Sequence, residues 1–192
     1  MKTQKNEAFA RTLLICGAYI GLFLLVRQII FPLQQMIAPN TATYAALIFL
    51  PHGVRVIATW LYREKAILPL LMVHLFAYRL FYWESGDAAL NMVAVLSGSL
   101  CVFIAMQLFR FSRIDIGLSN MTISHWRSLV FLGFISSVFN TAGNMLAMGD
   151  VMGSDLHLQV IATFIIGDTI GTLACLLILM LGFRLRRLAS SQ

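Results

Sequence analysis

The stretch LQVIATFIIGDTIGTLACLLILMLGF (residues 158–183) decides the fold, because it is long and apolar enough to cross a bilayer as a helix. Asp168 is its only acidic residue. An ionised carboxylate in hydrocarbon costs about 2.5–3.5 kcal/mol by the lower estimates, so it must find a partner or face a wet cavity. Asp168 is therefore the first candidate for a functional site.

The composition of the whole chain points the same way. Of the 192 residues, 59% are hydrophobic and 11% are charged, with a mean hydropathy of +0.83. Soluble domains carry about 25% charged residues, so we predict an all-α integral membrane protein. Cys16, Cys101 and Cys175 lie within apolar segments, which favours packing over disulfide or metal bonding. The net charge of +6 comes from basic residues at the ends of apolar segments, which favours membrane topology over nucleic-acid binding.

The pattern predicts one transmembrane domain, residues 1–192, with six helices. A helix needs about 20 residues to cross the hydrocarbon core, with a few residues of latitude for tilt. The predicted helices are 12–31, 44–62, 66–83, 88–109, 128–148 and 158–183. The first is expected to be retained rather than cleaved as a signal peptide, because the small-residue cleavage pattern is poor.

Basic residues predict the orientation of these helices. One side collects Lys2, Lys5, Arg11, Arg63, Lys65, Arg110, Arg113, Arg127, Arg184, Arg186 and Arg187, whereas Glu84, Asp87, Asp150 and Asp155 lie on the other. The positive-inside rule then places both termini in the cytoplasm, and we expect a bacterial inner-membrane protein. Residues 32–43 read as a short interfacial or re-entrant piece, and residues 110–127 as either an amphipathic surface segment or an ordinary loop.

Two opposite charges are predicted to meet inside the membrane. If both helices are continuous, Arg55 lies roughly 16 Å and Asp168 roughly 15 Å from the outer surface, at 1.5 Å of rise per residue. A buried charge without a partner is far more costly than a paired one. We therefore predict an Arg55–Asp168 pair, either purely structural or at the centre of a site.

Further polar residues gather in the same outer half of the predicted bundle. They are Arg27, His52, His74, Arg79, Asn91, Asn140 and Asn144. Together they predict an outward-facing polar pocket, and the excess of arginine over aspartate favours a small anionic ligand. Each has a plainer alternative: arginines snorkel to the interface, asparagines join helices, and histidines pack. Two histidines without a third ligand predict no metal site, and we expect no cofactor.

Proline and glycine mark two special backbone positions. Pro51 and Gly53 interrupt the second predicted helix, so we expect a kink there, at a depth where transporters and receptors commonly bind ligands. Gly167 and Gly171 flank Asp168 and would let a neighbouring element approach closely, which we expect to be the second helix.

Two stretches resemble a known family. FLPHGVRVIATWLYREKAILP (residues 49–69) and IGDTIGTL (residues 166–173) are similar to motifs of the membrane-associated sensor domain that precedes many bacterial histidine kinases and diguanylate cyclases. The matching positions are Pro51, Gly53, Gly167, Asp168 and Gly171. The resemblance implies a sensory role. The usual members have eight helices and an output domain, so here signalling is expected to pass to a separate protein partner. The six-helix size also fits substrate-binding subunits of vitamin importers.

We therefore predict a sensory or ligand-binding membrane protein, with a transporter subunit or a non-catalytic accessory subunit of a larger complex as alternatives. The predicted ligand-binding residues are His52, Arg55, His74, Arg79, Asn140, Asn144 and Asp168. The sequence shows no nucleophile with a base, no phosphate loop and no carboxylate pair, so we expect no enzyme. A lipid-modifying site built on the histidines stays an open alternative.

Overall fold

The computed structural model describes residues 2–42, 44–81, 87–114, 126–148 and 153–190, and this part of the chain is all-α. Its helices are α1 (Lys2–Leu25), α2 (Phe31–Ile37), α3 (Pro39–Ala42), α4 (Leu50–Tyr62), α5 (Ile67–Phe81), α6 (Ala88–Phe111), α7 (Trp126–Met148) and α8 (His157–Ala189). Short 3₁₀ turns, Arg63–Ala66 and Ser154–Leu156, precede α5 and α8. The all-α prediction is confirmed.

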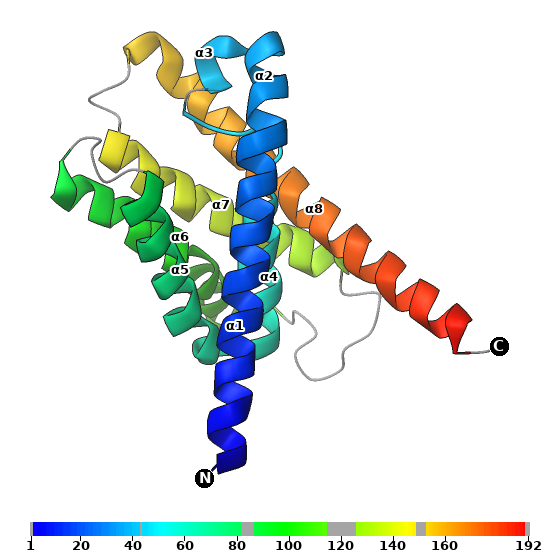
Figure 1. Cartoon of the computed structure of the whole chain (residues 1–192). Coiled ribbons are helices and arrows are strands. Elements are labelled where there is room, and N and C mark those ends of the chain that lie inside the picture. Colours follow the sequence, from blue (N-terminus) through cyan, green and yellow to red (C-terminus); the bar gives the residue numbers. More distant parts are fainter. Residues whose placement is uncertain (1, 43, 82–86, 115–125, 149–152, 191–192) are drawn as a thin grey trace.

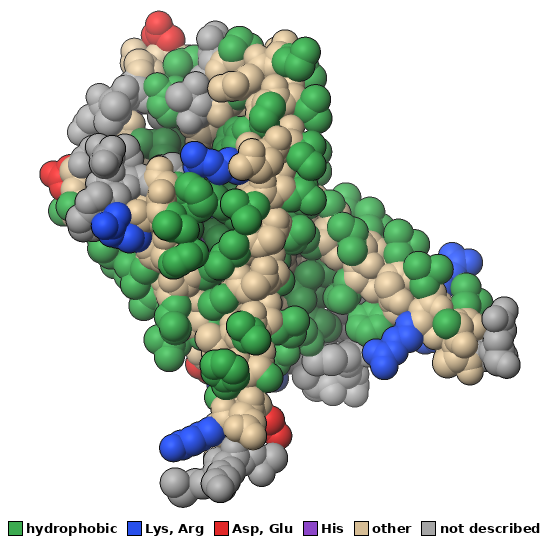
Figure 2. Space-filling view, viewed as in Figure 1, with side chains coloured by type: hydrophobic (Ala, Val, Ile, Leu, Met, Phe, Trp, Pro, Cys, Tyr) green, Lys and Arg blue, Asp and Glu red, His purple; other side chains and the backbone are tan. Residues whose placement is uncertain are grey.

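Four helical stretches are long and apolar enough to cross a membrane: Gln4–Ile37, Ala88–Phe111, Trp126–Met148 and Ser154–Ala189. Hydrophobic side chains cover the long sides of α1 and α8 (Figure 2). Such a surface is stable against lipid rather than water, which indicates a multi-pass membrane protein. α4 and α5, with 13 and 15 residues, are shorter than a full crossing.

α1 and α2 form one long rod that runs from the N-terminus to the end of the bundle where α3 lies (Figure 1). The two are joined by a π-helical turn, Val26–Ile30, in which Phe31 N–H bonds to Val26 O. Pro32 lies in the first turn of α2, directly after this π-helical turn, and donates no N–H to the helix. The helix therefore continues past the predicted end at residue 31, as far as Ile37, and the short helix α3 follows it.

The second predicted helix begins later than expected. Residues 44–49 are not helical, and α4 starts only at Leu50, so Pro51 lies in its first turn instead of kinking its middle. Two partners, Gln34 and Gly167, hold this non-helical segment. Gln34 donates to Ala45 O at 2.8 Å and accepts from Leu47 N at 2.7 Å, and Phe49 N donates to Gly167 O at 2.9 Å. The segment thus satisfies its backbone against α2 and α8 rather than within a helix.

Replacing Gln34 by leucine is expected to destabilise the fold, because it leaves the buried Ala45 carbonyl and Leu47 amide unpaired. Each such group costs about 1–3 kcal/mol. Gln35→Leu is the matched control, since Gln35 is the exposed next residue on the same helix. Thermal unfolding in detergent measures the difference. Equal melting temperatures for the two variants would show that Gln34 does not hold the segment.

The other predicted helices exist with shifted ends. The predicted 66–83 begins at Ile67, 88–109 extends to Phe111, 128–148 begins at Trp126, and 158–183 becomes the longer His157–Ala189. Residues 115–125 of the predicted surface segment, and Glu84, lie outside the described residues. The main core cluster joins α4, α6, α7 and α8 through Val56, Met106, Leu132 and Leu176. α8 leaves this core at its C-terminal end, where its side chains are exposed and its ribbon projects past the other helices (Figure 1).

Candidate functional site

Asp168 lies at the centre of a buried polar network between α4, α7 and α8. Its Oδ2 accepts hydrogen bonds from Ser137 Oγ at 3.0 Å and from Asn140 Nδ2 at 2.8 Å. The same oxygen lies 3.2 Å from His52 Nδ1. The residue is 0% exposed. A carboxylate taken fully out of water needs such contacts to remain in the interior.

Arg55 is the opposite charge that the sequence predicted. Its Nη2 lies 3.6 Å from Asp168 Oδ1, and both side chains are buried, so the predicted pair is confirmed. Nη1 donates to Gly98 O at 3.1 Å and to Asn140 Oδ1 at 3.2 Å. Asn140 therefore joins the two charges, because its amide donates to the carboxylate and accepts from the guanidinium.

Two polar atoms of the pair have no hydrogen-bond partner among the described residues. They are Asp168 Oδ1, an acceptor, and Arg55 Nε, a donor. The 3.6 Å from Asp168 Oδ1 to Arg55 Nη2 is also too long for a hydrogen bond. Buried polar groups are nearly always hydrogen-bonded. A group that both donates and accepts hydrogen bonds would therefore satisfy Asp168 Oδ1 and Arg55 Nε together.

His52 lies behind Asp168 and connects it to α7. Its Nε2 lies 2.9 Å from Ser136 Oγ and 3.1 Å from Gly133 O. The carbonyl only accepts, whereas the hydroxyl donates or accepts, so Nε2 finds a partner both with and without a proton. A chain of contacts leads from Ser136 through His52 to Asp168, in the same order as in a hydrolase triad. Neither Ser136 nor His52 lines the cavity described next.

A cavity of about 480 Å³ adjoins the network. Its polar lining includes Arg55, His74, Asn140, Asn144 and Asp168. From α6 it takes Asn91, Ala94, Val95 and Gly98, and from α7 it takes Asn140, Asn144, Ala147 and Met148. These residues run from the middle of both helices to the start of α6 and the end of α7. The cavity therefore extends from the buried pair toward the end of the bundle that holds α2 and α3.

Most of the cavity wall is apolar. Aromatic and aliphatic side chains that line it include Phe23, Phe31, Phe49, Phe164, Val95 and Met148. An apolar wall with a few convergent polar groups is the usual composition of a small-molecule site. Among the described lining residues, Arg55 and Asp168 are the ones with formal charge at neutral pH.

His74 is fixed at the edge of the cavity by two contacts. Its Nδ1 lies 2.7 Å from Leu70 O, which only accepts, so Nδ1 carries a proton. Its Nε2 lies 3.2 Å from Tyr19 Oη, so in the neutral ring the tyrosine hydroxyl donates to it. Asn144 bonds back to Asn140 through Nδ2, at 2.8 Å from the backbone oxygen and 3.2 Å from Oδ1.

The structure separates the predicted site residues into three groups. Arg55, His74, Asn140, Asn144 and Asp168 line the cavity, whereas His52 supports Asp168 from outside it. Arg79 is exposed and does not line it. The described part of the chain holds no group of three metal-ligating side chains.

The glycines flanking Asp168 bring a backbone segment against α8. A Cβ at Gly167 would lie 1.9 Å from Ala46 O, and one at Gly171 would lie 2.1 Å from Phe49 O. The close packing predicted for these glycines is therefore present. The neighbour is the non-helical segment before α4, and α4 itself meets α8 where Gly53 faces Cys175.

Sequence analysis missed Ser136, Ser137 and Tyr19. The signal for the serines was present on α7, where Gly133, the adjacent pair Ser136 and Ser137, Asn140 and Asn144 follow at three- or four-residue intervals and so share one face. Tyr19 had no such signal, because its apolar neighbours on α1 give no indication of the histidine it meets. No family model, curated protein or solved structure matches the chain.

Proposed function

We propose that the protein is a ligand-binding sensory protein of the bacterial inner membrane, with the cavity at Arg55 and Asp168 as its binding site. The observation that carries this proposal is Asp168, which is among the residues that line a cavity of about 480 Å³ and whose buried acceptor Oδ1 has no hydrogen-bond partner among the described residues. A buried pair serving stability alone would have its hydrogen-bonding capacity filled from within the protein.

The proposed topology has six crossings and both termini in the cytoplasm. α4 and the non-helical residues 44–49 would cross together, since the 13 helical residues alone rise only about 20 Å. α5 and its preceding 3₁₀ turn would cover about 30 Å. In this orientation the cavity extends toward the outer side of the membrane, and the basic end of α8 lies inside.

The charges around the cavity refine the proposed ligand. Arg27 lies over the Phe81 ring, 4.5 Å from its centroid, and Arg79 is exposed, so neither adds charge to the lining. The prediction of a small anion depended on these two arginines. The cavity wall is mostly apolar and carries one cation, Arg55, and one carboxylate, Asp168. The proposed ligand therefore has an apolar body and a single acidic group.

The proposed signal starts at the Arg55–Asp168 pair. A ligand group that bonds to Asp168 Oδ1 and Arg55 would compete with their mutual contact and so favour a different position of α8 relative to α4. α8 continues past the core to Arg184, Arg186 and Arg187, where its exposed end would contact a separate signalling partner. The resemblance to membrane-associated sensor domains supports the same reading.

Binding can be tested by filling the cavity without touching the charged pair. Ala94→Phe on α6 places a ring in the cavity, whereas Ala89→Phe changes an exposed residue of the same helix. The probes are acetate, benzoate, octanoate and inorganic phosphate. We expect benzoate or octanoate to raise the melting temperature of the native protein and of Ala89→Phe but not of Ala94→Phe. A ligand at 100 times its Kd stabilises by about 2.7 kcal/mol, which such a measurement resolves.

Two results would contradict the proposal. The first is that none of the four probes, at millimolar concentration, raises the melting temperature of the native protein. The second is that Ala94→Phe responds as strongly as Ala89→Phe, which would place binding elsewhere.

Transport is the second candidate, and one observation favours it. Residues 44–49 form a non-helical segment beside the buried pair, directly before the start of α4. Interrupted helices of this kind surround substrates in many transporters. Uptake of labelled octanoate and benzoate into proteoliposomes separates the two functions, since a sensor binds these acids without accumulating them.

A further inference from the structure

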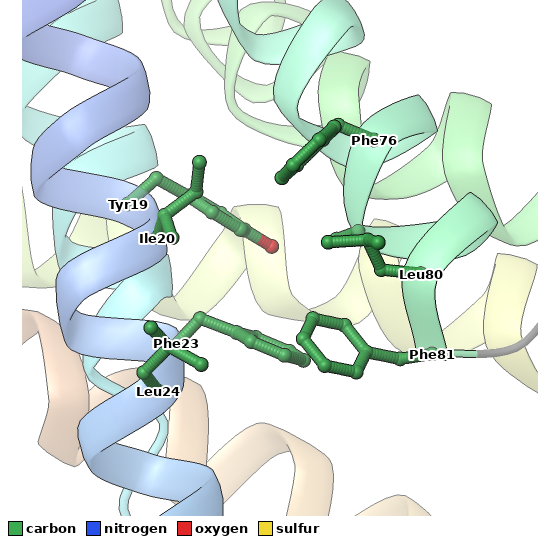
Figure 3. Close-up of a pocket in the computed structure, with 8 residues that line it drawn as sticks. Tyr19, Ile20, Phe23, Leu24, Phe76, Leu80 and Phe81 are labelled. Atoms are coloured by element: carbon green, nitrogen blue, oxygen red, sulfur yellow. The ribbon is translucent and has the colours of Figure 1, made fainter.

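A second space lies between α1 and α5. It is an apolar groove of about 260 Å³, lined by Tyr19, Ile20, Phe23 and Leu24 of α1 and by Phe76, Ala77, Leu80 and Phe81 of α5. Figure 3 shows these two sets of side chains facing each other, with the Tyr19 hydroxyl directed toward α5. Apart from that hydroxyl the lining carries no polar side-chain atom, so the groove is suited to a hydrocarbon chain and to no hydrophilic solute.

The groove adjoins the cavity that contains the charged pair. Tyr19, Phe23 and Ala77 line both spaces. Tyr19 also contacts His74 through its hydroxyl at 3.2 Å, and its ring centroid lies 4.8 Å from that of the histidine. Tyr19, Phe23 and Ala77 therefore border the apolar groove on one side and the cavity with the charged pair on the other.

The polar end has specific requirements for a head group. Asp168 Oδ1 accepts, Arg55 Nε donates, and neither has a hydrogen-bond partner among the described residues. A carboxylic acid satisfies both in its neutral, protonated form, because its O–H donates to the aspartate while its carbonyl accepts from the guanidinium. An ester offers acceptors alone and would leave Asp168 Oδ1 unpaired in the interior.

From these observations we propose that the ligand is a long-chain carboxylic acid that enters from the bilayer between α1 and α5, with its head at Arg55 and Asp168 and its chain in the groove. This inference rests on the proposed function, since it names the ligand class of the same site. The acyl chain of such an acid is already in the hydrocarbon of the bilayer before it binds. Entry from the side therefore does not require the acyl chain to cross water.

Photolabelling of the full-length protein in nanodiscs tests where the chain lies. The probe is hexadecanoic acid with a diazirine near the end of its chain. We expect saturable labelling of the α1 and α5 residues that line the groove, with competition by hexadecanoic acid and none by its methyl ester. Labelling spread evenly over lipid-facing residues such as the exposed half of α8, or equal competition by the ester, would overturn the proposal.

A matched pair of variants on α5 tests the groove itself. Leu80 lines it and Leu75 does not, although both are exposed on the same helix. Leu80→Trp is expected to weaken labelling about tenfold by overfilling the groove, whereas Leu75→Trp leaves it unchanged. Equal effects of the two variants would overturn the groove as the chain site.

The outcomes separate this inference from the function on which it rests. If benzoate or octanoate stabilises the protein but the long-chain probe does not label the groove, the cavity is a ligand site and the chain site is wrong. If neither short acids nor the long-chain probe bind, both proposals fall.

Discussion

Replacing Gly167 or Gly171 by alanine is expected to prevent the protein from reaching its folded state in appreciable yield. The added Cβ would lie 1.9 Å from Ala46 O or 2.1 Å from Phe49 O, and both neighbours are backbone atoms that no side-chain rotation can move. Overpacking of a core commonly costs about 1–3 kcal/mol and more where backbone must shift. Here the non-helical segment 44–49 would also lose the hydrogen bond from Phe49 N to Gly167 O.

The measurement is the monodisperse fraction after extraction in mild detergent, followed by thermal unfolding. Gly17→Ala and Gly21→Ala are the controls, because a Cβ at either position meets nothing within 4 Å among the described residues. Alanine in place of a helical glycine stabilises by about 0.5–1 kcal/mol, so these two should match or exceed the native protein. If Gly167→Ala melted like Gly17→Ala, the approach of the segment to α8 would be wrong.

The second large effect is expected from the charged pair. Arg55→Met leaves Asp168 without its cation, and Asp168→Asn leaves Arg55 without its anion. Removing one member of a buried pair costs about 3–5 kcal/mol because an uncompensated charge remains. The double variant Arg55→Met with Asp168→Asn leaves neither charge unpaired, so we expect it to be more stable than either single variant.

A double-mutant cycle measures this coupling. Residues in direct contact couple by about 0.5–3 kcal/mol, whereas distant residues add independently. Arg110→Met with Glu64→Gln is the matched comparison, since that pair is 3.8 Å apart but more than half exposed. Exposed pairs contribute about 0–1 kcal/mol. Additive effects at Arg55 and Asp168 would show that the two side chains do not depend on each other.

The position of the buried pair could be predicted from the sequence because hydrocarbon leaves a charge few choices. Arg55 and Asp168 fall at similar depths, and an ion pair is the least costly arrangement there. The structure contains the pair, with Arg55 Nη2 and Asp168 Oδ1 3.6 Å apart. The depth estimate assumed that residues 44–49 are helical, and they are not. The packing of α4 on α8 fixes the pair, whichever conformation the chain adopts before α4.

The start of α4 could not be predicted from local pattern. Residues 44–49 are apolar and read as helix, and Pro51 read as a kink within it. What decides their conformation is distant in the sequence: a glutamine on α2 and two glycines on α8 that leave room for backbone. Local propensity yields to such tertiary contacts when they satisfy the same backbone groups.

Arg79 shows the opposite limit. Sequence analysis grouped Arg79 with His74 because both fall in the outer half of the predicted bundle, but a spacing of five residues does not keep two side chains on one face of a helix. His74 faces the cavity, whereas Arg79 is exposed. Of the three arginines counted for the anion prediction, Arg55 lines the cavity, whereas Arg27 and Arg79 do not.

The sequence by itself determined that this chain is helical, apolar enough for a membrane, and obliged to pair one arginine with one aspartate, because each of these follows from the cost of polar groups in hydrocarbon. The tertiary structure alone decided which groups complete the pair and which face a cavity. Those depend on contacts between residues as distant as Gln34 and Leu47, or His52 and Ser136. Such contacts form between the faces of different helices. A local sequence pattern does not predict how those helices are rotated relative to one another.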